Sequence, residues 1–135
     1  MVARAAVGID LGTTNTVVAW ASLEGAASPV VRVLEVPQLV TRSEVAPRSL
    51  FPSTLYTPTD GEAVEDPFGD APWALGEYAR RRGTEVAGRL VASSKSWLVH
   101  SGVDRTAAIL PWGSEDDAAR LSPVDAAARL LAHVR

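Results

Sequence analysis

The sequence predicts a mixed α/β (or α+β) domain in which antiparallel strands come first and helices follow. Two observations support this prediction. Short β-branched apolar runs separated by turn residues fill the N-terminal part, whereas apolar residues at helical spacing follow in the second half. The 135 residues are 47% apolar and contain no cysteine, so they can bury one core without disulfides and form one domain at most.

Three strands are expected at the N-terminus. Residues 6–11 and 15–20 are apolar runs, and residues 12–14 supply a tight turn of Gly and Thr between them. Residues 30–36 are rich in valine and complete an antiparallel meander. Pro37 is expected to close this third strand, since proline is poorly tolerated inside a ladder of hydrogen bonds.

The middle of the chain is expected to be extended and irregular. Residues 49–57 form another extended segment, in which Pro52 marks an edge or an entry point. Residues 58–72 are rich in proline, glycine and acidic residues, which is typical of a loop. A short helix follows over residues 75–82, and Gly83 is expected to end it.

Two further helices are predicted, over residues 89–99 and 122–133. The second has a clear start, because Ser122 is a good N-cap, Pro123 suits the first helical position and Asp125 suits the positive end of the helix dipole. One apolar face of this helix is expected to be buried, and its members are Val124, Ala127, Ala128, Leu131 and Val134.

The first turn carries the candidate chemistry. Asp10 stands at the end of an apolar strand, where an unpaired charge is costly. Gly12 lets the backbone approach an anion closely, and Thr13 and Thr14 add hydroxyl donors to the N–H groups of the turn. Asp10 would repel a bare phosphate, so this pattern predicts Mg²⁺ held by Asp10 through water. Taken alone, residues 10–14 also fit an ordinary hairpin with a solvated aspartate.

The run G-I-D-L-G-T-T-N-T between two apolar strands resembles the first phosphate motif of the ATPase superfamily of actin, sugar kinases and 70-kDa heat-shock chaperones. The order of residues in this run is most similar to that of the heat-shock (DnaK-like) branch. The resemblance implies an actin-like (ribonuclease H-like) ATPase fold with ATP and Mg²⁺ as cofactors. It also implies phosphate contacts from Gly12, Thr13, Thr14 and Asn15, and a catalytic, metal-holding role for Asp10.

The rest of the chain is similar to the same family with less specific motifs. Residues 51–56 resemble its P-S segment, residues 75–79 its V-G-x-x-A element, and residues 121–135 its P-E-E-I-S-A helix. Lys95 matches the family lysine that reaches the γ-phosphate and is needed for hydrolysis, although its local chemistry equally fits a solvent-exposed residue. Residues 99–115 are unlike a standard chaperone, which indicates a divergent bacterial branch.

The resemblance also implies missing parts. The family ATPase has two lobes, and its second phosphate motif, adenosine motif and water-orienting acids are not found in these residues. We therefore expect residues 1–135 to be the N-terminal portion of the first lobe, able to bind ATP or ADP but incomplete for hydrolysis. Polypeptide clients and co-chaperones are the expected partners of the full-length protein. An apolar surface near the last helix and the tryptophans is expected to make the fragment self-associate.

Two other classes share the D-x-G-T-T hairpin: a sugar- or acetate-kinase-like phosphotransferase, and a non-catalytic actin-like assembly module. Charge and apolar content limit the kinds of partner that this chain is expected to bind. A net charge of −3 gives no case for nucleic acid, and no apolar stretch is long enough to cross a membrane. His100 and His133 lie too far apart for ligand spacing and are expected at the surface. The cytoplasm is the expected compartment.

Overall fold

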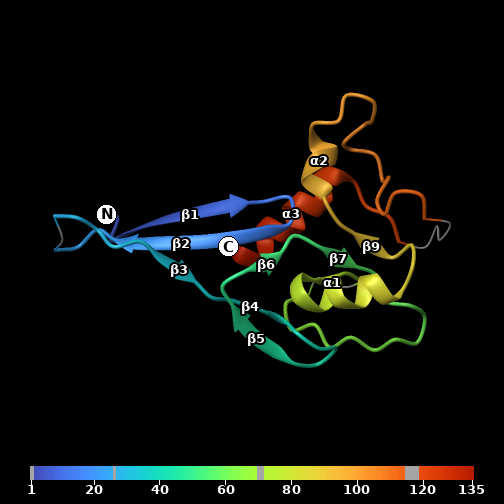
Figure 1. The fold of residues 1–135 in the computed structure, drawn as a ribbon, viewed down its shortest axis with the longest axis horizontal. Coiled ribbons are helices and arrows are strands. Elements are labelled where there is room, and N and C mark those ends of the chain that lie inside the picture. The colour runs from blue at the N-terminus through green and yellow to red at the C-terminus, as the bar shows by residue number, and fades with distance from the viewer. Residues whose placement is uncertain (1, 26, 70–71, 115–118) are drawn as a thin grey trace.

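The computed structural model of the chain describes residues 2–25, 27–69, 72–114 and 119–135. It is a mixed α/β structure with antiparallel sheets and a few helices, as the sequence predicts. Figure 1 shows a long hairpin of β1 and β2 that projects from a body containing the helices and the other short strands. The hairpin turn lies at the end next to the body, and the opposite end of the hairpin points away from it.

The first sheet confirms the predicted N-terminal meander. β1 (Ala5–Leu11) pairs antiparallel with β2 (Asn15–Ser22), and β2 pairs antiparallel with β3 (Arg32–Leu34). β6 (Phe51–Pro52) also pairs with β2, next to the turn. Among the described residues, β1 has β2 as its only neighbouring strand and therefore forms an edge of this sheet.

The third strand ends earlier than expected, and Pro37 does not close it. β4 (Val36–Leu39) contains Pro37 and pairs with β5 (Val45–Arg48) in a separate sheet. Pro37 lies opposite Pro47 in this register. Because neither proline has an N–H group, the two can face each other at a non-hydrogen-bonded position without removing a bond from the ladder.

The extended segment predicted for residues 49–57 divides between two sheets. β6 joins the first sheet, and β7 (Leu55–Tyr56) is the middle strand of a third sheet between β8 (Ala74–Leu75) and β9 (Leu90–Val91). The described part of residues 58–72 contains no helix or strand, as predicted for a loop. Asp70 and Ala71 of that loop lie outside the described residues.

The prediction that Gly83 ends its helix is wrong. α1 (Gly76–Glu85) continues through Gly83, which is buried. A Cβ atom at Gly83 would lie 2.5 Å from the Leu90 Cδ1 atom. Gly83 is therefore a close-packing position between α1 and β9, and the helix ends two residues later.

The helix predicted for residues 89–99 forms only in its second half. Leu90 and Val91 form β9, opposite Tyr56 and Leu55, and α2 (Ser94–Leu98) is only five residues long. Ser93 has a φ of 55°, which separates the strand from the helix. Pairing with β7 overrides the local helical spacing, because propensity is weak compared with tertiary contacts.

α3 (Pro123–Val134) forms where it was predicted, and the Ser122 hydroxyl caps it by accepting a hydrogen bond from the Asp125 N–H at 3.0 Å. The predicted buried face is confirmed in part, because Ala127 is buried and Val134 packs against the main core. Val124, Ala128 and Leu131 are exposed, contrary to the prediction. Pro123, Ala126 and Leu130 are buried beside Ala127. The sequence cannot distinguish these faces, because apolar residues occupy both.

The main core lies between β2, the third sheet and α3. It joins residues far apart in sequence, among them Val18, Phe51, Leu55, Val91, Leu121 and Leu130. His133 is not a simple surface residue, because its ring stacks on Phe51 at 4.5 Å and lies 4.4 Å from the Phe68 ring. These ring contacts fix the C-terminal end of α3 against β6.

The tryptophans do not form one exposed patch. Trp73 is 4% exposed and belongs to the core. Trp112 is 63% exposed and stacks on the half-buried Trp97 with ring centroids 4.8 Å apart. The exposed large apolar side chains of these regions are Trp112 and Val99, together with Val124 and Leu131 on α3. Glu115, at the end of the divergent segment 99–115, lies outside the described residues.

Candidate functional site

The turn between β1 and β2 is held from both sides. Leu11 packs against the main core, and the Gly12 N–H donates to the Asp10 carbonyl at 3.1 Å. On the other side, the Ser53 N–H donates to the Thr14 carbonyl at 2.9 Å. A Cβ atom on Gly12 would collide with the Asn15 carbonyl oxygen. Glycine is thus required here by the close approach of two backbone segments.

The polar side chains of the turn face solvent. Asp10 lies opposite Val17 in the hairpin and is exposed, and it forms no ion pair within the described part of the chain. Thr13 and Thr14 are also exposed. One carboxylate and two hydroxyl groups are therefore open to a ligand at this end of the sheet.

Asn15 lies at the base of the turn, and its side-chain oxygen is in an unusual environment. Its Oδ1 atom is buried and has no hydrogen-bond partner in the described structure. Below it, the buried hydroxyls of Thr16 and Ser53 share a hydrogen bond of 2.9 Å. A buried acceptor without a partner is costly, so the Asn15 oxygen calls for a donor from water or a ligand.

Thr16 and Ser53 were not expected as part of the site. The Thr16–Ser53 hydrogen bond joins β2 to β6 beneath the turn and so helps to hold its shape. The available signal was a polar residue inside an apolar strand, together with a serine next to Pro52. Only the tertiary structure reveals that the two hydroxyls meet.

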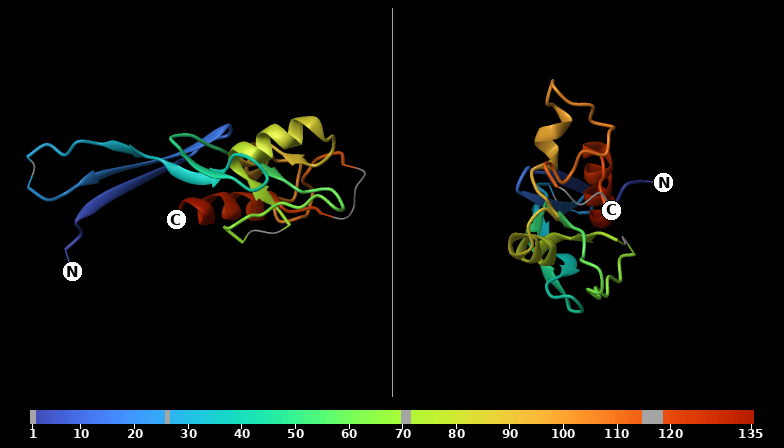
Figure 2. Two further views of the ribbon diagram at one scale, coloured as in Figure 1. Left: turned by 90° about the horizontal axis from the view of Figure 1, so that it is seen from below. Right: turned by 90° about the vertical axis from the view of Figure 1, so that its right-hand side faces the viewer.

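Lys95 is the only lysine of the chain and is exposed on α2. Trp97 on the same helix packs against the main core, as does Leu11 at the end of β1. Figures 1 and 2 show α2 at the end of the hairpin that carries the turn. Lys95 forms no ion pair with Asp10 or with any other described residue. The fold thus brings α2 to the turn without a direct contact between the two charges.

No group of three or more His, Cys, Asp or Glu side chains in the described ranges could hold a metal directly. A Mg²⁺ ion in a protein usually keeps several waters and needs only one or two carboxylates. The exposed Asp10 carboxylate, the exposed threonine hydroxyls and the tight Gly12 backbone lie together at this turn.

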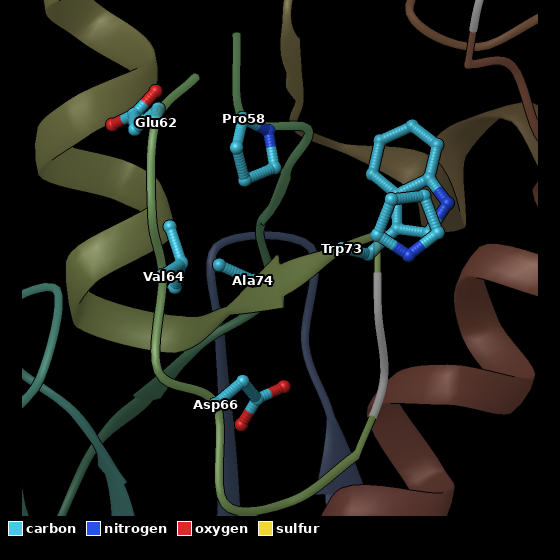
Figure 3. A pocket seen from close by; sticks show the side chains of 7 residues that line it. Pro58, Glu62, Val64, Asp66, Trp73 and Ala74 are labelled. Atoms are coloured by element: carbon cyan, nitrogen blue, oxygen red, sulfur yellow. The ribbon is translucent and has the colours of Figure 1, made fainter. Parts of the chain in front are cut away.

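A separate hollow of about 230 Å³ lies under the loop that precedes β8. Figure 3 shows Glu62, Val64 and Asp66 along one wall and Trp73 on the opposite side. The Glu62 carboxylate accepts hydrogen bonds from the hydroxyls of Tyr56 and Tyr78 at 2.6 and 2.9 Å. It also accepts one from Arg82 Nε at 2.8 Å.

These contacts define the protonation state of the Glu62 cluster, which consists of Glu62, Tyr56, Tyr78 and Arg82. Burial by itself raises the pKa of Glu62, but hydrogen bonds from Tyr56, Arg82, Thr59 and Tyr78 outweigh it and hold that pKa at about 2. Burial, and then the Glu62 carboxylate, raise the pKa of both tyrosines to about 12. Glu62 is thus charged at neutral pH, and its hydrogen bonds connect the loop to β7 and α1.

The chain has no match among protein-family models, curated proteins or solved structures. In the part of the chain that the structure describes, no helix combines the length and the apolar character needed to span a membrane.

Proposed function

We propose that this chain binds Mg-ATP through the β1–β2 turn, as the opening part of an actin-like ATPase domain of the DnaK-like chaperone class. The observation that carries the proposal is the geometry around Gly12. A backbone turn too tight for any side chain presents Thr13 and Thr14 to solvent, directly beside the exposed carboxylate of Asp10. Such a turn suits a phosphate chain that brings its own magnesium ion.

Each group has a definite part in this proposal. The turn N–H groups and the hydroxyls of Thr13 and Thr14 donate to phosphate oxygens, and Asn15 lines the base of the turn. Asp10 holds Mg²⁺ through water. Bound Mg²⁺ supplies neutralisation of phosphate charge. Lys95 reaches a terminal phosphate oxygen from α2, since a lysine is a compact point charge on a long flexible stem.

The same geometry predicts weak binding and no hydrolysis by this chain alone. Each exposed hydrogen bond contributes about 1 kcal/mol after competition with water. Association costs roughly 4 kcal/mol or more in lost translational and rotational freedom. Enclosing the adenine and orienting an attacking water require further groups, which we assign to a second lobe. Polypeptide clients, co-chaperones and a cytoplasmic location belong to this proposal for the full-length protein.

The single lysine permits a direct test. An acyl-phosphate derivative of ATP carries a reactive carbonyl on its γ-phosphate, and an adjacent amine attacks that carbonyl to form an amide and release ATP. We expect Mg²⁺-dependent acylation of Lys95, detected by peptide mass spectrometry and suppressed by excess Mg-ATP. The N-terminal amine, which is the other amine of the chain, provides an internal reference.

Matched variants make this test specific. Asp10→Asn should lower the labelling of Lys95 several-fold, because it removes the charge that holds Mg²⁺. Asp60→Asn removes another exposed carboxylate, in the loop, and should leave labelling unchanged. Equal labelling of Lys95 and the N-terminal amine, insensitive to Mg²⁺ and to Asp10→Asn, would reject the proposed nucleotide site.

A further inference from the structure

β1 is an exposed and largely apolar edge strand. It is seven residues long, and Val7 and Ile9 are 66% and 45% exposed. Figure 1 shows it along the outer border of the hairpin. A long edge strand offers a row of unpaired N–H and C=O groups, and natural proteins either protect such an edge or pair it with another strand.

The hydrogen bonds of the hairpin reveal which groups face outward. The Leu23 N–H donates to the Arg4 carbonyl at 2.9 Å, so Arg4 points its backbone groups toward β2. Because these directions alternate along an antiparallel strand, Ala6, Gly8 and Asp10 also point toward β2. The N–H and C=O groups of the intervening residues face the open edge, and these residues are Ala5, Val7 and Ile9.

We propose that this edge joins two copies of the chain, with β1 of one copy antiparallel to β1 of the other around a two-fold axis at Val7. In this register Val7 lies opposite its symmetry mate, and Ala5 lies opposite Ile9. All of the outward backbone groups from Ala5 to Ile9 are then paired. The two N-terminal sheets become one continuous sheet across the axis, which removes the open edge.

The charges on β1 favour this register, and they favour a second copy of the chain as the partner at the open edge. Arg4 and Asp10 lie three residues on either side of Val7, and the alternation of side chains along a strand puts them on the same face. Within its own copy, Arg4 Nε also donates to the Glu24 carboxylate at 2.6 Å. In the pairing around Val7, each Arg4 lies directly opposite Asp10 of the other copy, so two cross-strand ion pairs form. A register centred on Gly8 would instead place Asp10 opposite Ala6. β1 is therefore self-complementary in backbone, charge and apolar side chains.

The face with Val7 and Ile9 strengthens the inference. Val7 lies opposite Trp20 of β2, and Trp20 lies opposite Arg32 of β3, so these side chains share one face. Val18 on that face is buried in the core, whereas Val7 and Ile9 remain 66% and 45% exposed. Pairing two copies adds apolar neighbours to both residues. The dimer does not depend on the proposed nucleotide site, although both use Asp10.

Sedimentation equilibrium of matched lysine variants tests the edge. Val7→Lys puts two like charges opposite each other at the axis and should raise the dimer dissociation constant at least about tenfold. Val30→Lys is the control, since Val30 is 69% exposed and lies outside β1. A monomeric wild type at high micromolar concentration would overturn the proposal, as would equal effects of the two variants.

Charge reversal tests the register. Asp10→Arg and Arg4→Glu should each weaken the dimer, and the double variant should restore it because the opposite charges face each other again. Failure of this rescue would reject the axis at Val7. None of these measurements involves ATP, so failure of the dimer and failure of the nucleotide site are distinguishable.

A single introduced cysteine provides an independent test, because a disulfide between two copies reports directly which residues lie opposite each other. The chain contains no cysteine of its own. Directly opposite residues in an antiparallel pair have Cα atoms about 5.5 Å apart or closer, which is within disulfide range. Val7→Cys should therefore form a disulfide-linked dimer under mild oxidation, whereas Val30→Cys should not. Equal cross-linking of the two variants would contradict the proposed interface.

Discussion

The hydroxyl of Tyr56 donates a hydrogen bond of 2.6 Å to the carboxylate of Glu62, joining the third sheet to the loop that follows it. Tyr78 and Arg82 of α1 donate to the other oxygen of the same carboxylate. One side chain thus connects β7, the loop and α1. This arrangement makes Glu62 a sensitive point for stability.

Glu62→Gln should destabilise the fold by about 3 kcal/mol, because it removes a charge that accepts hydrogen bonds from two buried tyrosines and an arginine. Urea unfolding monitored by circular dichroism measures the effect. Glu65→Gln is the matched control, since Glu65 lies in the same loop and is exposed. A loss below about 0.5 kcal/mol for Glu62→Gln, the level of an ordinary surface change, would contradict the anchoring role.

The stability provided by Glu62 should depend on pH in a defined window. Its pKa in the folded chain is about 2, below the ordinary value of 4.5, so the folded state favours the charged form. The contribution is fully present above pH 4.5 and is lost as the pH falls toward 2. The difference in unfolding free energy between wild type and Glu62→Gln should shrink over that range. A difference that stays constant down to pH 2 would disprove this linkage.

The opposite behaviour is expected at high pH. The pKa values of Tyr56 and Tyr78 are raised from 10.0 to about 12, so the folded state favours the neutral phenols. Their contribution is complete below pH 10 and is lost as the pH rises to 12. Tyr78→Phe should reduce the slope of stability against pH in this range. An unchanged slope would mean that Tyr78 does not titrate as the structure implies.

Gly83→Ala should destabilise the protein by about 1–3 kcal/mol, although alanine normally stabilises a helix by about 1 kcal/mol relative to glycine. The reason is contact with Leu90, whose Cβ atom would lie 2.7 Å from the new side chain. Thermal unfolding measures the change. Arg80→Ala, at an exposed position of the same helix, should be nearly neutral. If Gly83→Ala stabilised the protein, the Leu90 side chain in β9 would have to move away at little energetic cost, which would contradict the close-packing role of Gly83.

Gly12→Ala and Gly8→Ala compare the effect of an added methyl group in the turn with its effect in the strand. A side chain at Gly12 meets the Asn15 carbonyl, so Gly12→Ala should cost at least about 2 kcal/mol and should abolish Lys95 labelling by the ATP derivative. At Gly8 a Cβ atom would have no other atom within 4 Å, so Gly8→Ala should leave stability within about 0.5 kcal/mol. Similar losses of stability in both variants would contradict the requirement for glycine at the turn.

Several features were predictable because they depend on neighbouring residues. The turn at residues 12–14, the antiparallel order of the first three strands and the Ser122 cap each follow from side chains within a few positions. The position of Asp10 beside the turn is also local, and it remains the basis of the proposed nucleotide site. These elements have the geometry that their own sequence favours.

Other features depended on partners that the local pattern does not contain. Residues 90–91 form a strand because β7 pairs with them, and Pro37 remains inside β4 because Pro47 faces it. The face of α3 was assigned only in part, since apolar residues cover most of its surface and the packing of the core selects among them. For residues 90–91, strand pairing outweighed a local helical preference of about 1 kcal/mol or less.

The sequence alone determined the N-terminal hairpin, its tight turn and the last helix, because backbone preference and capping act over a few positions. Only the tertiary structure decided that Glu62 joins Tyr56, Tyr78 and Arg82 and that Thr16 meets Ser53. It also decided that β1 lies at the edge of the first sheet in the described part of the chain. These relationships link residues that are 6 to 37 positions apart. Their side chains meet only after the sheets and helices have packed, so no local pattern encodes them.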